Sequence, residues 1–150
     1  MLGESKIKRL NELVNPNRRT PLILINQKNS EKIRGIEELL QSIPHLVIDF
    51  NEIKDGDLEK YLHKISSMER QIIFFRNIDE IPLGGERESW ELIVKIALKQ
   101  ENYPLEVQDC DGYFKKYELP FQNTKIISTC REYPEYLKHS GMLGEIMFLS

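Results

Sequence analysis

Hydrophobic residues along this chain form short continuous runs that alternate with stretches in which they recur every three or four positions. A continuous apolar run bounded by turn residues is typical of a strand buried on both faces, whereas the longer recurrence indicates one buried side of a helix. Strands that alternate with helices pair in parallel and have helices on both faces of the sheet. The pattern therefore predicts an α/β domain with three layers (αβα) around a parallel sheet of about five strands. The predicted strands are Leu22–Ile25, Val47–Phe50, Ile72–Phe75, Ile126–Ser128 and Ile146–Leu149.

Three segments between these strands have the spacing of helices with one apolar side. Ser30 is a favourable N-cap for the first helix, and Pro44 marks its end. The second helix begins near Asp57, and a short helix is expected at Pro134–His139. The apolar helix positions are Ile33, Ile36, Leu39, Leu40 and Ile43, then Leu58, Tyr61, Leu62 and Ile65, then Trp90, Ile93, Val94, Ala97 and Leu98.

A hairpin is predicted between the third helix and the fourth strand. The segment Leu105–Tyr117 has a β-prone pattern around the turn dipeptide Asp111-Gly112. Aromatic and basic residues are interleaved after that turn. They either pack on the domain or form a contact surface, and we carry the contact surface forward as the hypothesis to test. The residues concerned are Tyr113, Phe114, Lys115 and Lys116, followed by Tyr117.

Size and composition describe one ordinary domain. A chain of 150 residues buries roughly 68–70% of its extended surface on folding. Its 40% hydrophobic and 30% charged residues are typical of a soluble globular protein. No apolar run approaches the ~20 residues of a membrane span, and Cys110 and Cys130 lie far apart without a CxxC pair. We therefore expect a cytoplasmic protein with free thiols and no membrane contact.

Charge is distributed unevenly along the chain. The net charge is −3, which argues against a general nucleic-acid-binding surface. Residues 1–19 nevertheless carry five basic and two acidic side chains. We predict a basic helical arm at residues 1–19 and a core domain at residues 20–150. A solvated helix explains the charge of the arm, and a segment that contacts phosphate or a partner is the alternative.

The third predicted strand ends in two residues that matter for chemistry. The stretch Ile72–Ile81 reads IIFFRNIDEI, and its apolar run resembles the metal-binding strand of an ATPase. Such a strand ends in two acids, one that holds Mg²⁺ through water and one that polarises the attacking water. Here the two positions are Arg76, which would repel Mg²⁺, and Asn77, which cannot accept a proton. Asp79 and Glu80 follow, and we expect them to be a solvated loop pair rather than shifted metal ligands.

The segment after the first strand, Asn26–Ile33, has the length of the phosphate-binding loop G-x-x-x-x-G-K-[ST]. That loop works because its glycines let backbone N–H groups wrap the phosphates, while its lysine and hydroxyl hold the γ-phosphate and Mg²⁺. Lys32 stands in register with the lysine. The glycine positions are Asn26 and Glu31, and the hydroxyl position is Ile33. A lysine is common at a helix start, so Lys32 alone is weak evidence for a phosphate site.

The order of helix, hairpin and the strand Lys125–Thr129 completes a resemblance. Together with the two preceding segments it is similar to the nucleotide-binding core of an AAA+ ATPase over roughly Pro21–Ser150. The hairpin and strand resemble those of the Clp, RuvB-like and enhancer-binding-activator branches. There the strand is followed by an Asn that reads the γ-phosphate, and Arg131 takes that place here, as an anion contact or as an ordinary surface residue. The resemblance implies strand order 5-1-4-3-2. Compared with the family pattern, the Walker A and Walker B motifs of this chain are degenerate, and we expect no helical lid because the chain ends near the fifth strand.

No other residues form a recognisable catalytic or metal site. His45, His63 and His139 fall in different elements, and no Cys or His pair has the spacing of metal ligands. We expect histidines that are hydrogen-bonded or exposed. Cys130 at a strand end is expected to be a small buried residue rather than a nucleophile.

The residues favour a nucleotide-independent AAA+-like interaction domain over an enzyme. We predict a catalytically inactive protein-interaction or accessory subunit without a cofactor, for example in DNA replication, transcription activation or remodelling. The resemblance implies a protein partner or a homo-oligomer. We expect Arg76 to pair with a carboxylate such as Asp49, because an unpaired charge at a sheet end is costly. The vestigial nucleotide site would comprise Asn26, Lys32, Ile33, Arg76, Asn77 and Arg131.

Two alternatives stay open at this point. One is a divergent nucleotide-binding ATPase that uses Lys32, Asp49 or Asp79 in an unusual arrangement. The other is a nucleic-acid-binding module built from the basic arm and the hairpin.

Overall fold

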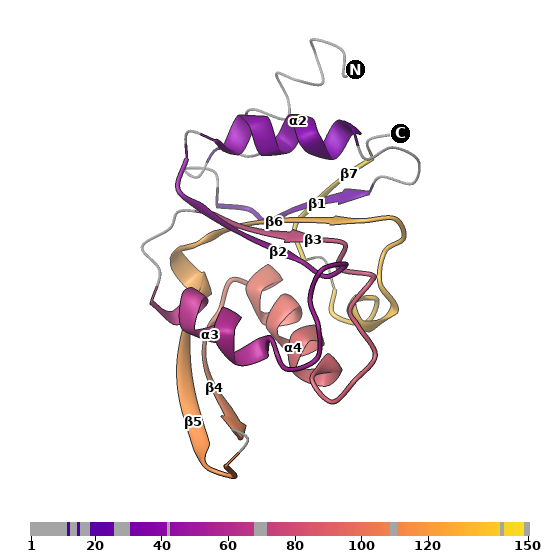
Figure 1. Cartoon of the computed structure of the whole chain (residues 1–150). Coiled ribbons are helices and arrows are strands. Elements are labelled where there is room, and N and C mark those ends of the chain that lie inside the picture. The colour runs from indigo at the N-terminus through magenta and orange to yellow at the C-terminus, as the bar shows by residue number, and fades with distance from the viewer. Residues whose placement is uncertain are drawn as a thin grey trace.

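The computed structural model describes residues 12, 15, 19–25, 31–41, 43–67, 72–108, 111–141 and 143–148, without the side chains of 31–34 and 39. Within these residues, five strands form one parallel sheet in the order β7-β1-β6-β3-β2 (Figure 1). This is the predicted order 5-1-4-3-2, and β3 lies inside the sheet as the AAA+ resemblance requires. The strands are β1 (Leu22–Ile25), β2 (His45–Asp49), β3 (Ile72–Arg76), β6 (Lys125–Cys130) and β7 (Glu145–Phe148).

Helices cover both faces of the sheet, which confirms the three-layer prediction. Helix α2 (Glu31–Leu40) lies on one face, and α3 (Leu58–Ser66) and α4 (Arg87–Leu98) lie on the other (Figure 1). Successive side chains of a strand point to opposite faces, so each strand contributes to both cores. Leu22, Leu24, Ile72, Phe74 and Ile127 pack with Ile36 and Leu40 of α2, whereas Ile23, Ile25, Ile73, Phe75 and Ile126 pack on the side of α3 and α4.

The predicted hairpin is present and forms a separate two-stranded antiparallel sheet from β4 (Asn102–Gln108) and β5 (Phe114–Pro120). It is three residues longer at each end than the sequence pattern indicated. In Figure 1 it extends beyond α3, away from the main sheet. Its residue Gly112 has a φ of 86°, a conformation that glycine adopts without strain. A 3₁₀ turn, η1 (Phe121–Asn123), connects the hairpin to β6.

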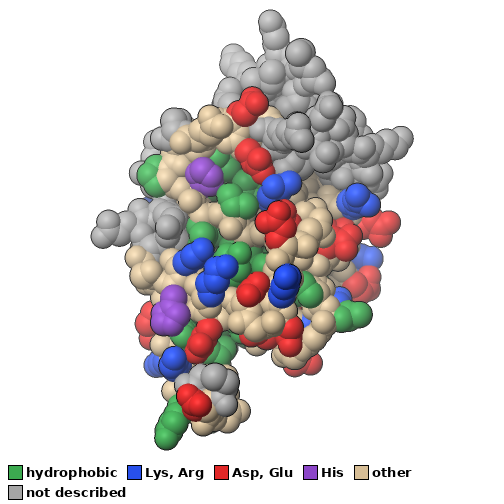
Figure 2. All heavy atoms as spheres, in the orientation of Figure 1, with side chains coloured by type: hydrophobic (Ala, Val, Ile, Leu, Met, Phe, Trp, Pro, Cys, Tyr) green, Lys and Arg blue, Asp and Glu red, His purple; other side chains and the backbone are tan. Residues whose placement is uncertain are grey.

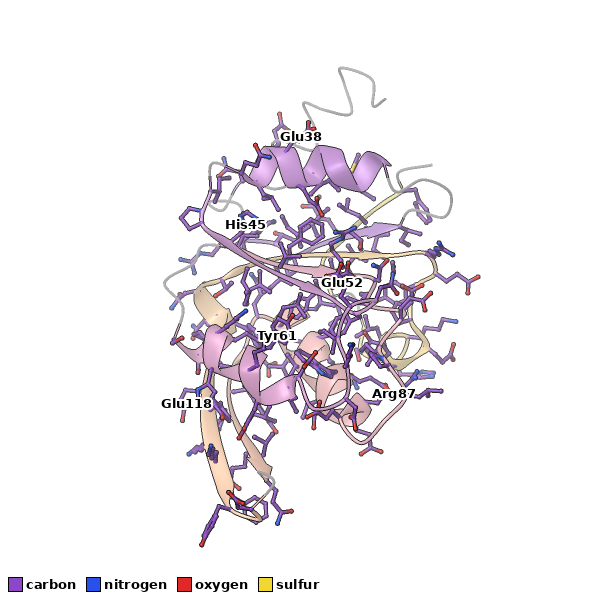
Figure 3. The ribbon with its side chains drawn as sticks, in the orientation of Figure 1. Glu38, His45, Glu52, Tyr61, Arg87 and Glu118 are labelled. Atoms are coloured by element: carbon purple, nitrogen blue, oxygen red, sulfur yellow. The ribbon has the colours of Figure 1, made fainter. Side chains whose placement is uncertain are left out.

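An aromatic cluster joins the loop after β2 to α3 and α4. Phe50 stacks on Phe75 at 6.1 Å and meets Trp90 edge-to-face at 5.3 Å. Tyr61 points from α3 toward α4 and meets Trp90 at 5.9 Å (Figure 3). Strand β2 begins at His45 and ends at Asp49, one residue before the predicted end. Phe50 therefore belongs to the loop after β2, and its ring packs in the core from there.

The start of α3 is held by a carboxylate from the start of α4. Glu86 Oε1 accepts hydrogen bonds from the backbone N–H groups of Gly56 (2.6 Å) and Leu58 (3.3 Å). Asp55 Oδ1 accepts one from the Glu86 N–H at 3.2 Å. Asp57, the N-cap residue, makes no capping bond with its own side chain. The two helices are thus tied at their amino ends by reciprocal contacts.

One predicted helix differs in the structure, and other predictions concern residues that the structure does not describe. The expected helix Pro134–His139 is one 3₁₀ turn, η2 (Glu135–Leu137), because the backbone N–H groups here bond to carbonyls three residues earlier. The predicted basic arm at residues 1–19 lies outside the described residues, apart from positions 12, 15 and 19, and so do Ser30 and Cys110. Among the described helices, none is long and apolar enough to span a membrane.

Candidate functional site

The carboxyl ends of the five parallel strands meet at one edge of the sheet, where open α/β sheets bind ligands. Strand β3 delivers Arg76 to this edge. Its Nη1 lies 2.6 Å from Oε1 of Glu37 on α2 and 3.7 Å from Oδ2 of Asp49 on β2. The predicted pairing with Asp49 is confirmed. Glu37 is nevertheless the closer partner, and no pattern in the sequence pointed to it.

Asn77 follows Arg76 and turns the chain at the end of β3. Its φ is 59°, in the left-handed region that Asn tolerates better than most residues. The side-chain Nδ2 donates to Asp49 Oδ1 at 2.9 Å, and the backbone N–H donates to Thr129 Oγ1 at 3.1 Å. The amide at this position therefore serves the turn and the neighbouring strand, and it offers no group that could accept a proton from water.

Asp49 is the buried carboxylate at this edge, and several donors share it. In addition to Arg76 and Asn77, the backbone N–H of Asn51 donates to Asp49 Oδ1 at 3.0 Å. Arg76 thus places a positive charge beside Asp49. Among the described residues, no group of three or more His, Cys, Asp or Glu side chains could hold a metal ion.

The predicted phosphate-loop residues, or their side chains, lie outside the described part of the structure. Asn26 lies outside the described residues. Lys32 and Ile33 form part of the first turn of α2, and their side chains lie outside the description. β1 ends at Ile25 and α2 begins at Glu31, and the residues between them lie outside the described part of the chain.

Asp79 is a structural acceptor, which corrects the expectation of a solvated loop residue. Its Oδ2 accepts hydrogen bonds from the backbone N–H groups of Arg131 (3.2 Å) and Glu132 (3.4 Å), directly after β6. The pairing of β3 with β6 brings these segments together, because Ile78 N also donates to Thr129 O at 2.9 Å. Glu80 is exposed, as expected. The side chain of Arg131 is exposed, and the contact of this residue with Asp79 is made by its backbone N–H group.

The hairpin separates the aromatic residues that the sequence analysis grouped together. Tyr113 and Phe114, next to the turn, are 73% and 69% exposed. Tyr117 is buried instead, edge-to-face on His63 at 5.2 Å, with its hydroxyl 3.3 Å from Nε2. Figure 2 shows hydrophobic side chains at the far tip of the molecule, over the β4–β5 hairpin. Of these three aromatic residues, only the two next to the turn are exposed.

Both lysines of the hairpin lie beside glutamates. Lys115 Nζ is 3.4 Å from Oε1 of Glu59 on α3, and Lys116 Nζ is 3.9 Å from Oε1 of Glu118 on the same strand. Residues 102–120 contain four acidic and two basic side chains. The hairpin is therefore acidic on balance, and its lysines are already close to carboxylates.

The remaining candidate residues have ordinary surroundings. His45 Nδ1 lies 2.8 Å from the Ile43 carbonyl oxygen, His63 contacts Tyr117, and His139 is exposed. Cys130 is buried, as predicted. Burial, and then the negative charge of Asp79, raises the pKa of the Cys130 thiol to about 12. A thiol with so high a pKa stays protonated near neutral pH and is a poor nucleophile.

Comparison with known proteins supports the fold that the sequence suggested. No protein-family model matches the chain, and no curated protein sequence matches it either. Solved structures do match. NtrX from Brucella abortus, in complex with ADP, superposes with a TM-score of 0.56 at 13% identity, over 99% of this chain and 36% of that one. The P216G mutant of Thermotoga maritima RuvB gives a TM-score of 0.57 at 14% identity, over 100% of this chain and 47% of that one.

A second structure of Thermotoga maritima RuvB, described as a Holliday junction branch migration motor, gives a TM-score of 0.54 at 15% identity. The match covers 99% of this chain and 45% of that one. The chain therefore spans less than half the length of these neighbours. At such low identity the likeness concerns the fold alone, and that fold is the AAA+-like P-loop domain.

Proposed function

We propose that this chain is a catalytically inactive AAA+-like domain that acts as a protein-interaction or accessory subunit, in replication, transcription activation or remodelling. The observation that supports this most directly is the contact of Arg76 with Glu37 and Asp49 at the carboxyl edge of the sheet. A guanidinium is permanently charged, so it disfavours Mg²⁺ beside these carboxylates. The network stabilises the edge without a nucleotide.

The ATPase alternative requires several groups that the chain lacks at the expected positions. Asn77 is committed to a turn and to Asp49, and it cannot act as a base. Asn26 and Glu31 replace the glycines, and Ile33 replaces the hydroxyl. Each missing buried contact of this kind is worth roughly 1–3 kcal/mol. Their combined loss supports the assignment of an inactive domain over a divergent enzyme.

Calorimetry tests the inactivity. Titration of the protein with ATP, ADP or GTP in the presence of Mg²⁺ should give no binding tighter than about millimolar, where binding is worth roughly 4 kcal/mol. No phosphate release should be detected. Lys32→Ala serves as the matched variant. Micromolar binding by the wild type that disappears in Lys32→Ala would establish the ATPase alternative instead.

The tip of the hairpin is the proposed contact surface for a protein. Tyr113 and Phe114 are largely exposed at the turn end of the antiparallel hairpin. Aromatic side chains make good anchors because they bury a large area for little lost entropy. The acidic balance of the hairpin disfavours a phosphate backbone, so we favour a protein partner or a second copy over DNA.

Replacement of Tyr113 and Phe114 by Ser tests this surface. The double variant should lose partner capture or shift the elution of an oligomer. Its melting temperature should stay nearly unchanged, because both side chains are already exposed. Leu83→Ser is the matched control, since Leu83 is an exposed apolar residue at 85% on a different loop. Unfolding of the double variant, or salt-dependent DNA binding by the wild type, would count against the proposal.

A further inference from the structure

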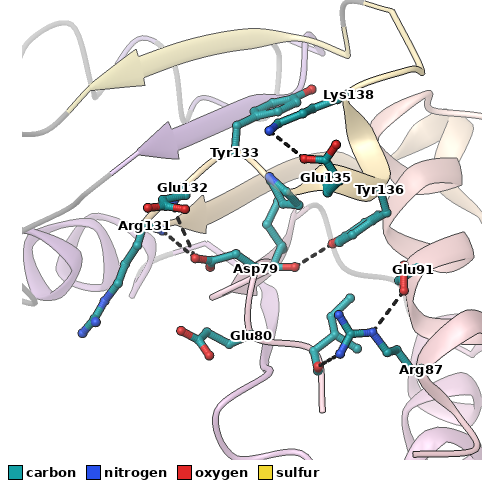
Figure 4. Close-up of a pocket in the computed structure, with 13 residues that line it drawn as sticks. Asp79, Glu80, Arg87, Glu91, Arg131, Glu132, Tyr133, Glu135, Tyr136 and Lys138 are labelled. Atoms are coloured by element: carbon teal, nitrogen blue, oxygen red, sulfur yellow. Dashed lines mark hydrogen bonds and ion pairs between the residues drawn. The ribbon is translucent and has the colours of Figure 1, made fainter. Parts of the chain in front are cut away.

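A pocket of about 750 Å³ lies on the loops that follow β3 and β6, beside the first turns of α4 (Figure 4). Residues 78–81 form one wall, residues 131–136 and 138 form a second, and Arg87 and Glu91 of α4 form a third. We call it the Asp79 pocket. Its volume is in the range that receives a small ligand or a long side chain. The Arg76 network lies on the other side of the turn at Asn77 and contributes no residue to it.

The pocket carries an excess of negative charge once its internal ion pairs are set aside. Arg87 Nε lies 3.2 Å from Glu91 Oε1, and Lys138 Nζ lies 2.7 Å from Glu135 Oε2. These pairs balance themselves. In Figure 4 the Arg131 side chain extends away from Asp79 and Tyr136. The carboxylates left without an ion pair among the described residues are Asp79, Glu80 and Glu132.

The Asp79 carboxylate is held in place but is only partly compensated. Its Oδ2 accepts the two long backbone hydrogen bonds from Arg131 and Glu132, at 3.2 and 3.4 Å. Its Oδ1 is buried and has no hydrogen-bond partner in the described structure. A buried carboxylate oxygen without a donor is costly, and a nearby cation offsets part of that cost. This charge is fixed by the fold rather than carried on a mobile side chain.

Two tyrosines give the pocket aromatic walls. Tyr133 and Tyr136 are both half-buried, and both line the pocket. The Tyr136 hydroxyl donates to the Ile78 carbonyl oxygen at 2.7 Å, which fixes the orientation of that ring. Aromatic faces attract cations, and a planar guanidinium also stacks on them. The walls and the charge therefore suit the same kind of ligand.

We propose that the Asp79 pocket binds an arginine side chain presented by a protein partner. Arginine fits better than lysine because its planar guanidinium can stack on a tyrosine while its positive charge lies near the carboxylates of the pocket. The long apolar stem of arginine also suits a pocket with tyrosine and proline in its wall. The inference rests on the proposed function only in that it takes the ligand to be part of a protein.

A short peptide tests the pocket directly. Acetyl-Gly-Arg-Gly-amide is titrated into the isotopically labelled chain, and the amide signals of Arg131, Glu132 and Tyr133 are followed by NMR. We expect saturable shifts that centre on these residues. The peptide with citrulline, which is neutral but has the shape of arginine, should bind at least about tenfold more weakly, with the lysine peptide in between.

Asp79→Asn removes the charge and keeps an oxygen that can accept the N–H groups of Arg131 and Glu132. It should weaken binding of the arginine peptide by about fivefold or more. Glu101→Gln is the matched control, since it removes the same charge from an exposed residue beside Thr20 and Pro21, away from the pocket. The control should bind the peptide as the wild type does. If Asp79→Asn lowers the melting temperature, the double variant Glu80→Gln and Glu132→Gln makes the same measurement.

Equal binding of the arginine and citrulline peptides would overturn the proposal, and so would unchanged affinity in the charge-removing variants. Shifts that centre on other residues would overturn it as well. The hairpin takes no part in this titration, so the Tyr113→Ser and Phe114→Ser variant should bind the peptide normally. Failure of the pocket and failure of the hairpin surface are therefore distinguishable.

Discussion

Reversal of the charge at residue 76 tests the central contact of the carboxyl edge. In Arg76→Asp, a carboxylate replaces the guanidinium beside Glu37 and Asp49. Two unit charges about 4 Å apart interact by roughly 1 kcal/mol in water and roughly 4 kcal/mol at the effective dielectric near a protein surface. The Asp49 side chain is 10% exposed and that of Glu37 is 38% exposed, so the repulsion from Asp49 is screened less than that from Glu37.

We expect Arg76→Asp to lower the free energy of unfolding by about 2–4 kcal/mol, and Arg76→Met, which keeps the apolar stem, by about 1–2 kcal/mol. For a chain of this length each kcal/mol corresponds to roughly 2–4 °C in melting temperature. Thermal unfolding followed by circular dichroism measures both losses. High salt should reduce the difference between the two variants because it screens the repulsion.

Glu37→Gln provides the internal check. Combined with Arg76→Asp it removes one of the two repulsive partners, so the double variant should be more stable than Arg76→Asp alone. Equal stability of Arg76→Asp and Arg76→Met would refute the electrostatic reasoning. The pair Arg76→Asp and Asn77→Glu restores both acids, and it should still hydrolyse no ATP, because the phosphate-loop positions remain changed. Detectable hydrolysis would contradict that argument.

Two further predictions concern neighbours of this edge. Asn77→Gly and Asn77→Ala both remove the side-chain amide that donates to Asp49, but only glycine adopts a φ of 59° without strain. In urea unfolding, the Asn77→Ala variant should therefore be less stable than the Asn77→Gly variant by about 1 kcal/mol. Burial raises the pKa of the Cys130 thiol from 9.0 to about 12. Between these pH values the folded state keeps a proton that the unfolded state releases, so the free energy of unfolding should fall as the pH rises above 9. Cys130→Ala should lack this part of the pH dependence, and a wild-type curve identical to that of Cys130→Ala would show that the thiol is not protected.

Much of the fold could be predicted because the central strands β1, β3 and β6 are buried on both faces. Continuous apolar runs such as Ile72–Phe75 leave few alternatives to a central strand, and the observed strands overlap all five predicted ones. The predicted bounds of the strands differ from the observed ones by a few residues, because adding or removing one residue at the end of an element changes the buried area little. Phe50 shows this, since it is apolar and next to β2 but packs on Trp90 from the loop.

Along strand β5, the alternation of apolar and polar residues already distinguished buried from exposed side chains, and the prediction did not use it. Side chains alternate along a strand, so Tyr117 and Leu119 share one side of β5, and Lys116 and Glu118 share the other. Tyr117 and Leu119 are buried, whereas Phe114 near the turn is exposed. A period-two reading would have separated Tyr117 from the tip. The exposure of Tyr113 depends on how far the hairpin extends beyond α3, and no local pattern reports that distance.

The residues alone determined the three layers, the parallel strands and the turn of the hairpin, because each follows from local burial or local backbone preference. Only the tertiary structure decided that Glu37 reaches Arg76 and that Asp79 accepts the N–H groups of residues 52 and 53 positions further along the chain. Those contacts depend on the register between β3 and β6 and on the placement of α2 over the sheet. A single side chain contributes little to either, since both are set by the packing of the whole apolar core.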